Sequence, residues 1–144
     1  MGVRELQDNG VLYVTNHIVL PEMYNRQQLP VNESTLNRFK RFAQLMEPSG
    51  SHSFYGQIDP AVMAKIGRDR VNPHTLEASP LDVFDDDASP GGNGSLRQGL
   101  YDPDKLLLWV AAGSPPVPEN PFVCFSIGEL LRFPNPIPCE SPAL

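Results

Sequence analysis

Prolines constrain this chain more than any other feature of its sequence. Sixteen prolines and eleven glycines stand among 144 residues. Proline lacks the backbone N–H that helices and inner strands need, so stretches such as SPPVPENP and PNPIPCESPAL resist both regular structures. A chain of this length can form one domain with a modest core. We therefore expect long irregular segments between its helices and strands.

The charge and the apolar pattern narrow the classes of partner. The formal net charge is −6, which provides no cationic field to attract nucleic acid or an anionic membrane. No apolar run reaches the roughly 20 residues needed to cross a bilayer, and the opening sequence MGVRELQDNG is too polar for a secretory signal. The sequence predicts a cytoplasmic protein that binds neither nucleic acid nor membrane.

The residues that most often carry metal or nucleophilic chemistry are scattered. Cys124 and Cys139 are compatible with a disulfide, but a reducing compartment favours free thiols. The acidic run at 85–87 lacks the spaced ligands, the glycine and the distal glutamate of a calcium loop. The histidines have no neighbouring pattern of a triad or a metal site. We predict no metal ligand and no catalytic residue in this chain.

The first half reads as alternating helix and strand. The run VLYVTNHIVL at 11–20, preceded by a helix end at 4–10, is typical of a strand buried on both faces. The segment NESTLNRFKRFAQLM at 32–46 has apolar residues at helical spacing behind a capping asparagine or serine. The run HSFYGQI then predicts a second strand, and this order is the repeating unit of a parallel α/β fold.

The second half is less regular. Acidic and glycine-rich residues around 84–99 predict a linker between a segment 1–83 and a proline-rich tail 100–144. Within YDPDKLLLWVAAG, Asp102 at an N-cap and Pro103 behind it predict a helix of about ten residues, although the continuous apolar run fits a strand equally well. The rest of the tail is expected to be disordered or loosely packed.

Gln57 is the candidate binding residue. A glutamine at the carboxyl end of a buried strand presents an acceptor and donors to a planar heterocycle. The alternative is an ordinary loop amide that bonds to the backbone, which the local sequence alone favours.

Residues 4–83 resemble part of the old yellow enzyme family of flavin-dependent ene-reductases. RELQDNGVLYVTNHIVL resembles its helix-then-strand passage, with Thr15-Asn16-His17 in place of the usual Thr-Gly-Asn. STLNRFKRFAQLMEPSGSHSFYGQI is similar to the helix and strand that lead to its Gly-Gln-Ile/Leu step, and NPHTLEASPLDV looks like a later loop. The resemblance implies an α/β fold, a partial (β/α)8 TIM-barrel fragment followed by an irregular proline-rich C-terminal tail.

The same resemblance implies a function and shows what is missing. It gives Gln57 the role of hydrogen-bonding the pyrimidine ring of FMN, in an enzyme that passes hydride from NAD(P)H to an enone or enal. The family's His-x-Gly-Arg loop is replaced by Asp59-Pro60, with Gly67-Arg68 several residues too far along. The His/Asn or His/His pair that orients the substrate carbonyl in the family, its tyrosine proton donor and its basic FMN-phosphate site have no match here. We therefore expect a truncated flavin oxidoreductase that is inactive without a chain that completes the barrel. The alternative is a non-catalytic interaction or accessory protein, or a degenerate gene product.

Overall fold

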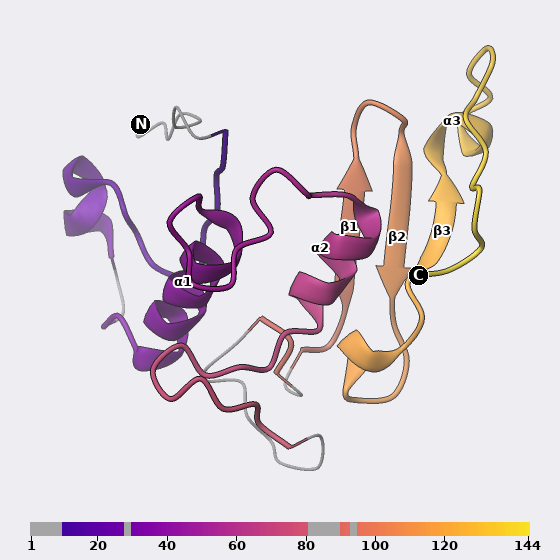
Figure 1. Ribbon diagram of the computed structural model, residues 1–144. Coiled ribbons are helices and arrows are strands. Elements are labelled where there is room, and N and C mark those ends of the chain that lie inside the picture. The colour runs from indigo at the N-terminus through magenta and orange to yellow at the C-terminus, as the bar shows by residue number, and fades with distance from the viewer. Residues whose placement is uncertain (1–9, 28–29, 81–89, 93–94) are drawn as a thin grey trace.

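The computed structural model describes residues 10–27, 30–80, 90–92 and 95–144, and Figure 1 shows how its elements follow one another. The elements are η1 (Pro21–Arg26), α1 (Glu33–Met46), α2 (Pro60–Gly67), β1 (Gln98–Asp102), β2 (Leu107–Ala111), η2 (Val117–Glu119), β3 (Val123–Ser126) and α3 (Ile127–Leu130).

Two predicted features fall largely outside these ranges. The helix end predicted at 4–10 enters the described residues only at Gly10, which has a φ of 71° as expected for a glycine that ends a helix. Much of the linker predicted at 84–99, including the acidic run, also lies outside them. A division of the chain at that linker stays a prediction.

The sheet is antiparallel, and the predicted fold class is therefore wrong. Its three strands lie in the order β1-β2-β3, and each pairs antiparallel with its sequence neighbour. A (β/α)8 barrel requires parallel strands joined by crossover helices. In the part of the chain that the structure describes, the strands instead follow one another through short connections as a meander, and no barrel segment is present.

The predicted helix at 32–46 is confirmed. α1 begins where the side chain of Asn32 accepts a hydrogen bond from the N–H of Thr35 at 3.0 Å. An asparagine at this position satisfies one of the four N–H groups that a helix start leaves without a partner. Thr35, Arg41 and Leu45 are the buried positions, and Arg41 joins the helix to the loop after α2 through an ion pair with Asp69.

Neither strand predicted in the first half forms. Residues 11–20 run extended beside α1, and Tyr13 bonds through its hydroxyl to the Glu47 carboxylate. Residues 52–58 contain two turns and irregular backbone between them. A β-rich sequence becomes a strand only when a neighbouring strand pairs with its N–H and C=O groups. In the described part of the chain no ladder reaches either segment, so the β propensity leads only to extended or turning backbone.

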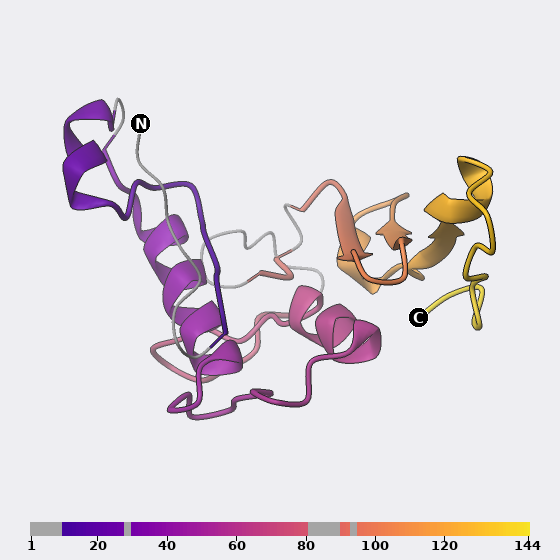
Figure 2. The ribbon, with the colours of Figure 1, turned by 90° about the horizontal axis from the view of Figure 1, so that it is seen from above.

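The buried core forms where α2 packs on one face of the sheet. It consists of Ala64 from α2 with Leu107, Trp109, Ala111, Val117 and Phe122. Ala111 and Phe122 are completely buried. Figure 2 shows α2 on one side of the sheet near β1, and α3 beyond β3 at the far end of the sheet.

The segment predicted as a helix at Asp102–Pro103 forms a hairpin, so the strand alternative is the one observed. The side chain of Asp102 does accept from the backbone N–H groups of Asp104 and Lys105, each at 3.1 Å. The chain then turns through Leu106, whose φ is 54°, and returns as β2. A non-glycine residue in this left-handed region ends any helix at that point.

The proline-rich tail is ordered, contrary to the expectation of an irregular segment. β3 adds to β2, and residues beyond α3 return to cover its free edge through Leu144, which exchanges hydrogen bonds with Phe122 at 3.1 and 3.2 Å. A disulfide joins Cys124 of β3 to Cys139. The expectation of free thiols is therefore wrong, because the fold brings together two residues whose separation in sequence carries no such information.

Candidate functional site

Gln57, the residue predicted to contact a flavin, lies on an exposed turn. Its backbone N–H donates to the carbonyl of Phe54 at 2.9 Å. Two residues later Asp59 begins α2 by accepting from the N–H of Val62 at 2.7 Å. The turn therefore leads into a helix, and no strand of the described residues ends at this glutamine. Flavin contact by Gln57 stays a prediction of the resemblance.

Gly67 and Arg68 hold the sheet and the helix together. Arg68 donates from Nε to the carbonyl of Pro118 at 2.9 Å and from Nη2 to that of Leu144 at 3.0 Å. The carbon of its guanidinium lies 5.0 Å from the centre of the Phe122 ring. Backbone carbonyls and a ring occupy the guanidinium, so this arginine has a structural role.

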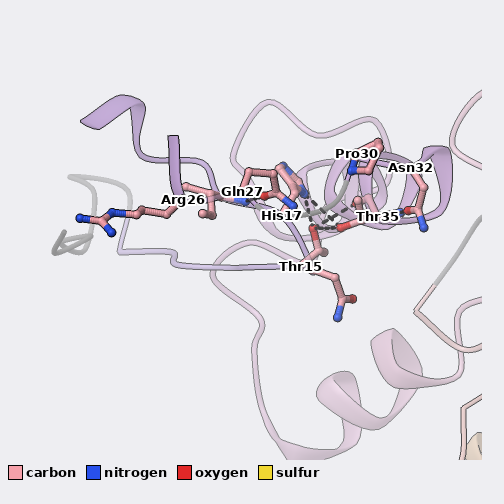
Figure 3. A pocket seen from close by; sticks show the side chains of 9 residues that line it. Thr15, His17, Arg26, Gln27, Pro30, Asn32 and Thr35 are labelled. Atoms are coloured by element: carbon pink, nitrogen blue, oxygen red, sulfur yellow. Dashed lines mark hydrogen bonds between the residues drawn. The ribbon is translucent and has the colours of Figure 1, made fainter. Parts of the chain in front are cut away.

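A cavity of about 560 Å³ opens between the extended segment before η1 and the start of α1. Figure 3 shows that Thr15, His17 and Thr35 point toward one another at its wall. The Nδ1 atom of His17 lies 2.9 Å from the hydroxyl of Thr15 and 3.0 Å from that of Thr35. An imidazole beside two hydroxyls is the arrangement here that most resembles a catalytic one.

The direction of the hydrogen bonds argues against nucleophile activation at this cluster. The Thr15 hydroxyl donates to the carbonyl of Thr35, and the Thr35 hydroxyl donates to the oxygen of Thr15. In this arrangement both hydroxyl protons are used in bonds to other oxygens, and Nδ1 of His17 takes the donor role. A general base must accept the proton of the nucleophile. Burial also lowers the pKa of His17, and the cluster ties the extended segment to α1.

A second candidate site is a groove between α2 and the edge strand β1. One compartment, of about 290 Å³, lies at the start of α2 beside Tyr101 and Asp102. The next, of about 250 Å³, lies beside Gln98 and is closed on its far side by α1. Met63 and Leu100 line both compartments. The two cavities are therefore neighbours along β1, with apolar residues between them and charged residues toward their ends, and we call them together the groove.

The face of the sheet that α2 does not cover is also apolar. Strand pairing places Tyr101, Leu108 and Phe125 in one row across it and Gly99, Val110 and Val123 in the next. We call these six residues the outer face. Tyr101 is 56% exposed, Val123 45% and Phe125 42%. An antiparallel sheet with one solvated face normally places polar side chains there, so this face is unusual.

Sequence reasoning did not find the groove or the outer face. In the structure, buried and half-buried residues alternate along LLWVA, and Leu107, Trp109 and Ala111 face the core. A strand of this kind would be recognised in a sequence by apolar and polar residues at alternate positions. Because the residues between the three core positions are also apolar, the period of two was hidden.

Comparison with known proteins adds no identity. No family model, no curated protein and no solved structure matches this chain. Among the described residues, no group of three or more His, Cys, Asp or Glu side chains is placed to hold a metal ion. Within the same ranges, no helix has the length and apolar character needed to span a bilayer.

Proposed function

We propose that this chain is a non-catalytic interaction protein that binds a partner polypeptide through its sheet. The observation that carries the proposal is the outer face, whose six uncharged residues come from three strands. Four of them, Gly99, Tyr101, Val123 and Phe125, are exposed, and the two from β2 are half-buried. Contiguous apolar surface of this kind marks interaction sites in soluble proteins.

The second support is the edge of the sheet. β1 is hydrogen-bonded to β2 on one side, and within the described residues no strand pairs with its other side. An unpaired strand edge is a template for another chain. The apolar face and the open edge meet at Gly99 and Tyr101, so one partner segment can use both.

The test is selection of binding peptides from a random library against the immobilised full chain. We expect ligands that saturate at one peptide per chain and bind with a negative heat-capacity change, which reports burial of apolar surface. Tyr101→Ser should weaken binding, while Tyr24→Ser on η1, at an equally exposed tyrosine away from the sheet, should not. A selection that yields no saturable ligand would refute the proposal.

A further inference from the structure

The groove between α2 and β1 has the form of a site for an extended peptide. Alternate residues of β1 point to the same side, so Gln98, Leu100 and Asp102 face the side of the sheet that α2 covers. Gly99 and Tyr101 belong to the outer face and also border the compartments at the strand edge. The two compartments meet at Leu100. If a further strand paired with β1, two of its residues, at positions i and i+2, would place their side chains in the two compartments.

Within the described ranges, one backbone edge of β1 is unpaired, while the side chain of Gln98 at the start of the strand donates to the carbonyls of Gly67 and Pro90. β1 packs against α2 and pairs with β2. Every second N–H and C=O of a strand paired on one side only points away from its partner. In the described chain, no backbone hydrogen bond from another segment reaches these groups. The edge can therefore accept one further strand.

Charges at the two ends of the groove differ in sign. The compartment at the start of α2 is lined by Asp59 and Asp102, whose carboxylates accept from backbone N–H groups. The other compartment is lined by Arg38, which donates to the neutral oxygens of Ser34 and Asn16 at 3.3 and 2.8 Å. None of the three takes part in the ion pairs found among the described residues, Arg41–Asp69 and Arg70–Glu119. A ligand with complementary charges at its ends fits this order.

We propose that an extended peptide binds along β1 as an additional antiparallel strand, with apolar side chains at alternate positions in the groove, a basic residue at its N-terminal end and an acidic residue at its C-terminal end. This inference rests on the proposed interaction function and specifies its ligand. Strand addition of this kind takes its affinity from main-chain hydrogen bonds and its specificity from pockets for alternate side chains. The antiparallel direction continues the pairing of the existing sheet.

The test uses a capped peptide of alternating valine and threonine with an N-terminal lysine and a C-terminal glutamate, titrated into the full chain with its disulfide intact. We expect saturable binding at one peptide per chain. Methylating the backbone nitrogens of one alternate set of residues should weaken binding at least about tenfold, because those N–H groups face β1. Methylating the other set should leave the affinity unchanged, since those groups face solvent.

A second measurement compares peptides that carry their two charged residues in opposite order. A peptide with lysine and glutamate exchanged should bind less tightly. Arg38→Glu should remove or invert that preference, whereas Arg26→Glu makes the same charge change beside a different cavity and should preserve it. Both variants replace partly or fully exposed side chains. We therefore expect both to fold, so a change in peptide preference reports on binding.

Four outcomes would overturn the inference. Equal effects of the two methylation sets would mean that the peptide binds without strand pairing, and indifference to Arg38→Glu would remove the assigned direction; in both cases the proposed interaction function survives. No saturable binding of this peptide, with library peptides still bound, also refutes only the strand addition. Absence of binding by the probe and by every library peptide refutes both proposals.

Discussion

Replacing Arg41 with methionine should be among the most destabilising single changes in α1. Its guanidinium pairs with Asp69 through two hydrogen bonds, Nε to Oδ1 at 2.8 Å and Nη2 to Oδ2 at 2.7 Å. The two side chains are only 4% and 13% exposed. A third donor, Nη1, reaches the amide oxygen of Gln44 at 3.0 Å. The pair is therefore well shielded from water, and each of the three guanidinium nitrogens donates a hydrogen bond.

The loss of stability comes from the Asp69 carboxylate, which stays buried without its cationic partner. Methionine keeps the volume of Arg41 but leaves the Asp69 carboxylate with the N–H of Val71 at 3.2 Å as its remaining partner among these contacts. Breaking a buried ion pair from one side costs about 3–5 kcal/mol, and we expect about 3 because that one donor stays. A domain of this size is stable by about 5–15 kcal/mol in total, so the loss would be readily measured.

The assay is urea unfolding followed by circular dichroism, comparing the free energy of unfolding at constant slope. Arg38→Met, on the same helix but outside the ion pairs of the described chain, is the matched control and should cost less than about 1 kcal/mol. Adding Asp69→Asn to Arg41→Met should recover part of the loss, since no charge then remains buried. A loss below about 1 kcal/mol for Arg41→Met, or no recovery in the double variant, would refute this reasoning.

Four further changes have expected outcomes. Phe122→Ala should cost about 3–5 kcal/mol in urea unfolding, because Phe122 is fully buried in the core, whereas exposed Phe133→Ala should cost less than about 0.5 kcal/mol. Reducing the disulfide, which joins residues 15 apart, should lower the free energy of unfolding by about 3 kcal/mol. Burial lowers the pKa of His17 below its ordinary 6.5, so the unfolded chain binds that proton more readily. Stability from this group should be complete above pH 6.5 and be lost as the pH falls through the lower folded-state pKa, and His17→Gln should flatten that dependence. Because Gln57 lies on an exposed turn, the purified chain should carry no flavin absorbance through desalting after incubation with FMN.

The contrary results are equally specific. Equal losses for the two phenylalanine variants would place the core elsewhere. An unchanged urea midpoint in dithiothreitol, with both thiols titratable, would mean that the disulfide does not constrain the fold. Stability that rises on acidification would reverse the assigned effect of burial on His17. Flavin that stays bound and is lost in Gln57→Ala would support the family resemblance.

Local signals in the sequence were sufficient for α1. Asn32 and the apolar spacing behind it predicted α1, because a cap and an amphipathic stripe act within a few residues. Asp102 shows the limit of such signals. It accepts the backbone N–H groups that an N-cap would accept, yet the chain turns into a hairpin because β2 finds its partners in β1 and β3.

The remaining errors concern contacts distant in sequence. The run at 11–20 has a strong β composition but no ladder partner in the described chain, and composition cannot supply one. The pairing of Cys124 with Cys139 depends on the return of the tail beside β3. The groove likewise depends on where α2 crosses β1, which the segment at 60–67 does not encode alone. The predicted flavin function is neither supported nor opposed by these contacts.

The covered edge of β3 sets a limit on assembly. The returning segment bonds to Phe122 and Cys124 along that edge, and its Pro142 has no N–H to offer a further chain. A sheet whose two margins are both free can grow by repeated addition and form fibrils. Because the edge of β3 is covered, only one further strand can add to the sheet, at β1. This chain is therefore expected to form complexes of fixed stoichiometry and not open-ended polymers.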